Sequence, residues 1–399
     1  MSETAGATVL VTDGEERAAL AVVRSLGRAG YRVHVCSASG RPLAAASRHC
    51  HASVTLPSPL REPESYREAI AKLLERWRID VLLPISEQSL RILLPARFER
   101  LGVRVPFPAA DVFAAVSDKE ELLRRCGRFE LAAPVQQVLA SADQSADVEA
   151  RLSFPVVVKP TRSVVANGGA GSIKTGVAYA TDMVGLRRLL GELPAVAYPV
   201  LLQERIVGPG SGIFLLIWDG ELIAAFAHRR LREKPPAGGV SVYSESVTLD
   251  PTLVGHGLRL LRGFGWQGVA MLEFKTDSHT GRPYLMEING RLWGSLQLAV
   301  DAGVDFPALL VSCALGERPA RPTYRIGVRN RWWWGDVDHV LARLRNSPAA
   351  LNLPPGAPSR WQVVRNFLRV WRPGERNEVL RVSDPWPFVR ETVDWLRRA

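Results

Sequence analysis

The stretches Met271-Leu-Glu-Phe-Lys275 and Leu285-Met-Glu-Ile-Asn289 decide the fold of this chain. Both read as strands, and the turn-rich segment between them predicts an antiparallel hairpin. Side chains alternate across a strand, which places Glu287 and Asn289 on one face with Glu273 opposite them. Two carboxylates and an amide oxygen would then converge among apolar neighbours, where uncompensated charge is costly. All-oxygen ligation suits Mg²⁺, so the hairpin predicts a metal site, with a solvated sheet face as the alternative.

The composition is that of an ordinary globular protein. The chain has 399 residues, of which 47% are hydrophobic and 23% charged, enough for two or three domains. No apolar run approaches the ~20 residues that a membrane span needs, and the N-terminus lacks the basic and hydrophobic segments of a secretory signal. The four cysteines are scattered without metal or redox spacing. These features predict a cytoplasmic protein with no transmembrane segment.

The first ~105 residues alternate between strand and helix patterns, which predicts a small parallel α/β domain. Its strands are expected at residues 7–12, 31–36 and 81–85. No G-x-G-x-x-G fingerprint follows the first strand, so dinucleotide binding is unsupported. Asp13-Gly14 and Ser86-Glu87 would lie nearest the crevice at the strand ends, with a purely structural role as the alternative.

A phosphate-binding pattern follows in the middle of the chain. Lys159 ends a strand and enters a Gly-rich segment centred on residues 167–172, whose backbone N–H groups could hold phosphate oxygens. A second lysine, Lys119, falls within a helix expected over residues 111–125, and Gln203-Glu204 ends a strand beyond the Gly-rich segment. Each feature alone is more often structural, so the prediction depends on their order along the chain.

In that order the motifs resemble those of the ATP-grasp superfamily, over roughly residues 1–316. The matching pieces are Ser117-Asp-Lys119, Val156-Val-Val-Lys-Pro160, Gly168-Gly-x-Gly171, Gln203-Glu-Arg-Ile206 and Glu273…Glu287-x-Asn289-x-Arg291. The resemblance implies a mixed α/β and α+β fold: a parallel pre-ATP-grasp domain at 1–107, a first ATP-grasp subdomain at 108–206 and a second at 207–318. A basic, helical, Trp/Arg-rich extension at 319–399 lies outside it.

The resemblance also implies a role for each matching residue. The nucleotide phosphates would be bound by Lys119 and Lys159 and covered by a lid loop of Gly168, Gly169, Gly171 and Ser172. The adenine and ribose edge would be bound at a strand end by Gln203, Glu204 and Ile206. Mg²⁺ would be bound at the hairpin by Glu273, Glu287 and Asn289. Two departures affect this pattern. Gly290 stands where family members often carry proline, and no acidic ribose ligand is evident in residues 208–212.

Most ATP-grasp enzymes share one reaction, in which a carboxylate attacks the γ-phosphorus of ATP and an amine, less often a thiol, displaces phosphate from the resulting acylphosphate. The resemblance therefore predicts a ligase that uses ATP and Mg²⁺. Its partners would be a small-molecule carboxylate and an amine, or a carrier-protein thiol. The alternatives are a phosphotransferase acting on a hydroxyl and a non-catalytic nucleotide-binding protein.

Three arginines complete the predicted site. Arg291 could stabilise the transferring phosphoryl group, or it could form an ion pair with one of the hairpin glutamates. Arg230 and Arg232 would share one face of a strand and offer guanidinium forks to the substrate carboxylate. A solvated basic edge strand is the alternative for this pair.

The tail from residue 319 to 399 has fifteen arginines, seven acidic residues, no lysine and seven tryptophans. Such a segment could face an anionic membrane surface, an acidic carrier protein or nucleic acid. The interpretation we favour is that its helices pack their tryptophans on the ligase core, and no nucleic-acid partner is expected. A homodimer and a peripheral membrane contact are both compatible with the sequence.

Overall fold

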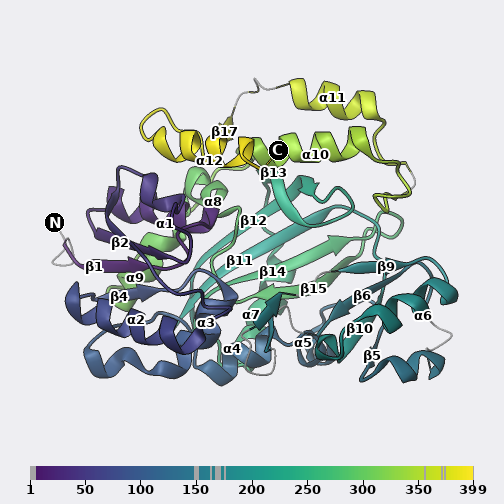
Figure 1. Cartoon of the computed structure of the whole chain (residues 1–399), viewed down its shortest axis with the longest axis horizontal. Coiled ribbons are helices and arrows are strands. Elements are labelled where there is room, and N and C mark those ends of the chain that lie inside the picture. The colour runs from purple at the N-terminus through teal and green to yellow at the C-terminus, as the bar shows by residue number, and fades with distance from the viewer. Residues whose placement is uncertain are drawn as a thin grey trace.

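The computed structural model describes residues 6–147, 152–161, 164–166, 172–174, 177–354, 356–369, 372 and 374–398. The chain forms three larger sheets (Figure 1). The N-terminal α/β part and the four-stranded sheet of residues 136–204 lie on opposite sides of a seven-stranded sheet (Figure 1).

The N-terminal part is a parallel α/β sheet of order β3-β2-β1-β4, as its strand–helix pattern predicts. Its elements are β1 (Thr8–Val11), α1 (Arg17–Arg28), β2 (Arg32–Ser37), β3 (Cys50–Thr55), α2 (Pro63–Arg76), β4 (Val81–Leu83) and α3 (Glu87–Leu93). Strand β3 was not predicted from the sequence. It lies at the edge of the sheet and is only half-buried, so it lacks the apolar run that marks the other strands.

One helix expected over residues 111–125 is two in the structure, α4 (Ala110–Ser117) and α5 (Lys119–Cys126). The break lies at Asp118, whose carboxylate accepts hydrogen bonds from the backbone N–H groups of Glu120 and Glu121 and so caps α5. Lys119 is therefore the first residue of a helix rather than an interior one.

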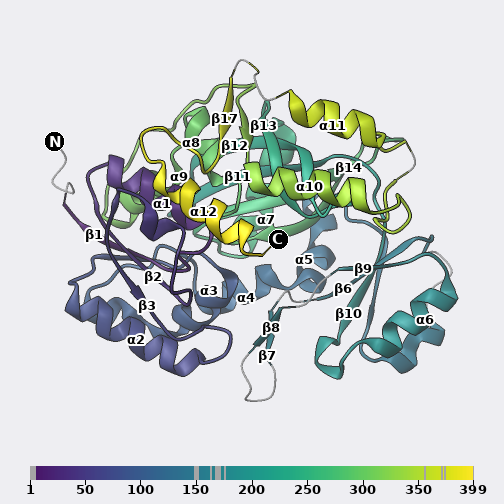
Figure 2. The ribbon, with the colours of Figure 1, turned by 45° about the horizontal axis from the view of Figure 1, so that its top comes forward.

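The second sheet is antiparallel, with order β5-β10-β6-β9 and a hydrophobic core of its own. Its elements are β5 (Gln136–Leu139), β6 (Val156–Pro160), β9 (Ala178–Ala180), α6 (Met183–Glu192) and β10 (Val200–Glu204). A separate two-stranded pair, β7 (Val164–Ala166) and β8 (Ser172–Lys174), stands apart from the larger sheets (Figure 2). The predicted lid glycines Gly168, Gly169 and Gly171 lie outside the described residues.

The third sheet has the order β15-β14-β11-β12-β13-β16-β17 and is antiparallel except for its last pair. Its elements are β11 (Gly210–Trp218), β12 (Glu221–Lys234), β13 (Val240–Ser246), α7 (Pro251–Gly263), β14 (Gly268–Thr276), β15 (Pro283–Asn289), α8 (Leu296–Ala302), α9 (Phe306–Ala314), β16 (Arg329–Arg331) and β17 (Glu375–Asn377). The hairpin predicted from the sequence is present as β14 and β15. Its apolar side chains, together with helices α8 and α9, share one core with α1 of the N-terminal part.

The tail contributes β16 and β17 to this sheet and three helices, α10 (Trp333–Arg345), α11 (Arg360–Leu368) and α12 (Trp386–Leu396). Helix α10 packs against β12 and β13, and α12 reaches the N-terminal part beside α1 (Figures 1 and 2). The prediction that the tail tryptophans pack on the rest of the protein is confirmed for Trp332, whose ring centroid lies 3.9 Å from the guanidinium carbon of Arg17. It does not hold for Trp361, which is 83% exposed. The tail is thus partly built into the fold.

Within the described residues, no single helix is long and apolar enough to cross a membrane. Helices α8 and α9 reach the necessary length and composition only together, and they are bent 91° apart.

Candidate active site

A cavity of about 360 Å³ lies between the β5-β10-β6-β9 sheet and the β14–β15 end of the seven-stranded sheet. It gathers residues that the sequence places far apart. The predicted site residues that line it are Lys119, Lys159, Gln203, Glu204, Ile206, Arg230, Glu273, Glu287, Asn289 and Arg291. Arg232, by contrast, is not part of this lining.

Two carboxylates face each other in this cavity. Strand pairing puts Glu273 directly opposite Glu287, and a β-bulge follows Glu273. The Asn289 amide nitrogen donates to Glu287 Oε1 at 3.0 Å, and Lys119 Nζ lies 3.5 Å from Glu287 Oε2. Glu273 is held by Arg230, whose Nη1 donates to Glu273 Oε1 at 2.8 Å.

The surroundings separate the two glutamates electrostatically. Burial alone would raise the pKa of Glu287, but the charges of Lys119 and Lys159 outweigh it and lower that pKa to about 2. Burial raises the pKa of Glu273, and the neighbouring charge of Glu287 adds to the effect against the opposing pull of Arg230. Glu287 is therefore ionised, while burial and the charge of Glu287 oppose ionisation of Glu273.

Lys159, the last lysine before the Gly-rich segment, is nearly buried in β6. Burial lowers its pKa to about 8, with a further contribution from the like charge of Lys119. Glu287 acts in the opposite direction. Two lysines and two glutamates thus line the same cavity, with Lys119 Nζ 3.5 Å from Glu287 Oε2.

This donor set fits a hard divalent cation. Burial and, to a lesser degree, the charge of Glu287 raise the pKa of Glu273, and a cation between the two carboxylates would relieve that repulsion. The side-chain oxygen of Asn289 is also the right ligand type. In the part of the chain that the structure describes, no group of three or more His, Cys, Asp and Glu side chains could hold a metal. An ion here would therefore complete its shell with amide oxygen, water and phosphate, as Mg²⁺ commonly does.

The part of the cavity around Gln203 fits a flat, partly polar group such as adenine. Gln203 on β10 is fully buried, and its Oε1 has no hydrogen-bond partner among the described residues. A buried acceptor without a donor is costly, and an exocyclic amine would supply one. Val157, Tyr179 and Met286 add apolar and aromatic surface around it.

The expectation that Arg230 and Arg232 share one face is wrong. Register shifts occur between Arg230 and Arg232 and again after Arg232, so the strand does not alternate there. Arg232 Nε donates to Asp336 Oδ1 of α10 at 2.6 Å, and its guanidinium lies over the ring of Tyr243. Arg230 lines the cavity but is bound to Glu273 and to Glu233 Oε1 at 3.0 Å.

Arg291 donates to Asn289 Oδ1 at 3.2 Å and to the carbonyl oxygen of Leu292 at 3.0 Å, and it forms no ion pair with either hairpin glutamate among the described contacts. For Asp13, the contacts support the structural alternative given above. Its buried carboxylate accepts hydrogen bonds from Ser86 N and Oγ and from Ser89 Oγ, which is the structural role. Glu87 lines a small pocket beside the hairpin.

Several lining residues escaped the sequence analysis. Arg17 reaches the cavity from α1, and its Nη1 donates to both carboxylate oxygens of Glu378 at 2.7 Å. Its partner lies 361 residues away, so no local pattern indicates the contact. Lys275 and Glu233 also line the cavity. Their positions in the sequence could have indicated this, because each lies on a strand two or three residues from a predicted site residue, Glu273 or Arg230.

This architecture is similar to that of several known proteins. The fold is that of ATP-grasp proteins, which confirms the predicted fold class and the resemblance at the level of the fold. More particularly, a family described as "ATP-grasp in the biosynthetic pathway with Ter operon" matches residues 197–334.

Among solved structures, the L-amino acid ligase from Bacillus licheniformis superposes with a TM-score of 0.60 and 19% identity over 80% of this chain and 75% of that chain. The biotin carboxylase domain of 2-oxoglutarate carboxylase from Hydrogenobacter thermophilus, a dimer in complex with ADP, magnesium and bicarbonate, has a TM-score of 0.63 and 16% identity over 81% and 73%. The carbamoyl phosphate synthase large chain of Halomonas eurihalina is 23% identical over 62% of this chain. The chain spans 24% of that relative's length.

Proposed function

We propose that this protein is an ATP- and Mg²⁺-dependent ligase that activates a carboxylate as an acylphosphate and joins it to an amine. The observation that carries the proposal is the pairing of Glu273 and Glu287 beside Lys119 and Lys159 in one cavity. A carboxylate oxygen of the substrate would bond to the γ-phosphorus while the bond to the ADP oxygen breaks. The amine nitrogen would then bond to the acyl carbon, with loss of a proton and release of phosphate.

The chain's own residues suit the charge distribution of that reaction. Attacking and leaving oxygens both carry negative charge, which Lys119 and Lys159 would offset. Mg²⁺ held by Glu273, Glu287 and Asn289 would supply further charge compensation for the phosphates. Arg291 lies on the same strand end and presents its guanidinium to the cavity beside Asn289.

The four-part division at residues 107, 206 and 318 belongs to the same proposal. We also propose a cytoplasmic location, which the four free cysteines support, since free thiols are expected in a reducing compartment. A carrier-protein thiol as nucleophile, a peripheral membrane contact of the tail and a homodimer stay predictions.

The test is a hydroxylamine trap. Purified protein, ATP and Mg²⁺ are incubated with single amino acids and small carboxylic acids in the presence of hydroxylamine. A ligase yields a hydroxamate and ADP in equal amounts, since hydroxylamine captures the activated acyl group. A stable phosphoester without hydroxamate would identify a phosphotransferase and refute the ligase proposal.

A further inference from the structure

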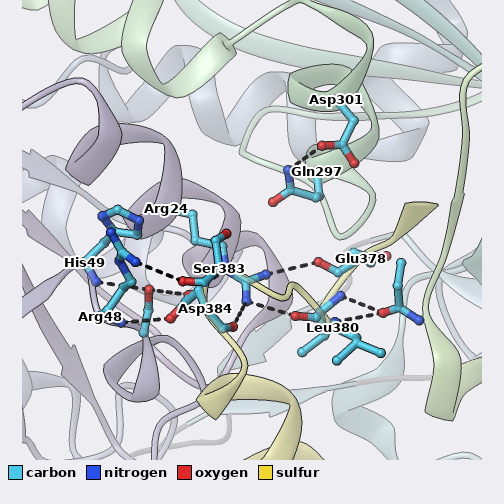
Figure 3. A network of polar contacts seen from close by, with 12 residues as sticks. Arg24, Arg48, His49, Gln297, Asp301, Glu378, Leu380, Ser383 and Asp384 are labelled. Atoms are coloured by element: carbon cyan, nitrogen blue, oxygen red, sulfur yellow. Dashed lines mark hydrogen bonds and ion pairs between the residues drawn. The ribbon is translucent and has the colours of Figure 1, made fainter.

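A second cavity, of about 350 Å³, lies where α1 and α8 meet the tail segment 376–384. Figure 3 shows the polar contacts of several of its lining residues, among them Arg24, Gln297 and Asp384. The cavity shares no lining residue with the candidate active site. Its volume falls in the range of ~300–1,000 Å³ typical of small-molecule sites.

The lining of this cavity is strongly basic. Five arginines line it, against two aspartates. The arginines are Arg24, Arg28, Arg325, Arg376 and Arg381, and the aspartates are Asp301 and Asp384. A concave surface lined by one sign of charge concentrates the field and attracts counter-ions.

Both aspartates are already engaged inside the protein. Asp384 Oδ2 accepts a hydrogen bond from Arg24 Nε at 2.8 Å. Asp301 Oδ2 accepts from Arg381 Nη2 at 2.5 Å. In the described part of the chain no carboxylate pairs with Arg28 or Arg325, which are both exposed. Positive charge is therefore left at the mouth of the cavity.

Gln297 provides a second, independent indication of a ligand. Its side-chain nitrogen donates to Asp301 Oδ1 at 3.1 Å, and since an ionised carboxylate can only accept, this bond fixes the orientation of the amide. Its Oε1 is then a buried acceptor without a partner among the described residues. Gln297 is only 3% exposed, and Figure 3 shows it facing the Arg24–Asp384 network. Such an acceptor calls for a donor.

We propose that this cavity binds a small phosphate- or carboxylate-bearing molecule that also carries a hydroxyl or amino group. The anionic group would lie between Arg28 and Arg325 at the mouth, and the donor would reach Gln297 Oε1 on the floor. Because α1 also begins with Arg17 of the candidate active site, the two sites share one helix.

The experiment measures binding of inorganic phosphate, malonate and glycerol phosphate to the full chain by calorimetry. We expect the double variant Arg28→Gln/Arg325→Gln to bind all three about tenfold or more weakly, since each guanidinium contributes a charge-assisted contact. The matched control Arg67→Gln/Arg187→Gln removes two exposed arginines elsewhere and is expected to bind like the parent. Thermal unfolding curves check that each variant is folded.

Two further variants separate the possibilities. Lys159→Ala weakens the candidate active site, so anion binding that survives Lys159→Ala but is lost in the Arg28/Arg325 variant supports the second site. The reverse pattern, equal losses in the control, or no anion binding by the parent would overturn it. Gln297→Leu should abolish any preference for glycerol phosphate over inorganic phosphate; a preference that persists contradicts the role of Gln297.

Discussion

Glu273 and Glu287 pair across β14 and β15, yet different cationic side chains lie beside them. Glu287 faces two lysines, which lower its pKa to about 2, whereas Glu273 is tied to Arg230. Lys119 and Lys159 therefore have two roles in the proposal. They compensate the negative charge of Glu287 in the free protein and that of the phosphate oxygens in the complex. A divalent cation between the two carboxylates would take over the first of these tasks.

The first prediction concerns Glu287→Gln, which keeps the shape of the side chain and removes its charge. We expect ADP release to fall by about 10²-fold or more, because one charged contact to the metal and phosphates is lost. The variant should still fold, with a lower midpoint of thermal unfolding, because Lys119 and Lys159 lose the charge that compensates them. The matched variant Glu130→Gln, at a glutamate 71% exposed, should keep parental turnover. Activity of Glu287→Gln within a few-fold of the parent would contradict the site assignment.

The second prediction follows from the pKa of Lys159, which burial lowers to about 8. Lys159 is cationic below that pH and becomes neutral as the pH rises through it. ADP affinity, measured by calorimetry at constant Mg²⁺, should therefore weaken between pH 7 and 9. Lys159→Arg stays charged over this range and should flatten the dependence. An equally steep pH dependence in that variant would assign the effect to another group.

At the scale of elements, the sequence predicted the orientation of side chains on the β14–β15 hairpin but not on β12. The β14–β15 hairpin was predictable, because polar and apolar side chains alternate regularly through Glu287 and Asn289. The same rule failed for Arg232, because the β-bulges beside it break the alternation. Bulges depend on the partner strand and on α10, and neither is visible in the local pattern. The helix break at Asp118, by contrast, carries a recognisable N-cap residue.

The third prediction tests this different placement of the two arginines. Among the described ion pairs, Arg232→Ala leaves the fully buried Asp336 with the longer 3.5 Å contact to Arg331 alone. We expect the free energy of unfolding in urea to fall by about 3 kcal/mol, with ATP affinity unchanged. Arg230→Ala should instead raise the KM of the carboxylic substrate more than that of ATP. An Arg232→Ala protein as stable as the parent would refute the structural role.

At the scale of the whole molecule, the C-terminal tail packs against the N-terminal part of the chain. The N-terminal part and the seven-stranded sheet share one core, while the β5-β10-β6-β9 sheet has another. The parallel N-terminal sheet was predictable from strand–helix alternation. The tail contacts were not, since Arg24 and Asp384 lie 360 residues apart and neither belongs to a motif. Such contacts hold Arg17 at the cavity as well, through Glu378.

The last prediction concerns this closure. Arg24 and Asp384 form an ion pair with side chains 1% and 3% exposed, and burial lowers the pKa of Arg24. Asp384→Ala would leave the guanidinium buried without its carboxylate, so we expect a loss of about 3–5 kcal/mol in the free energy of unfolding. Arg318→Ala, which breaks an exposed pair with Asp219, should cost less than about 1 kcal/mol. Equal losses in the two variants would mean that the tail contributes no more to stability than a surface contact. A large loss confined to Asp384→Ala would instead make the tail part of the folded unit that positions Arg17.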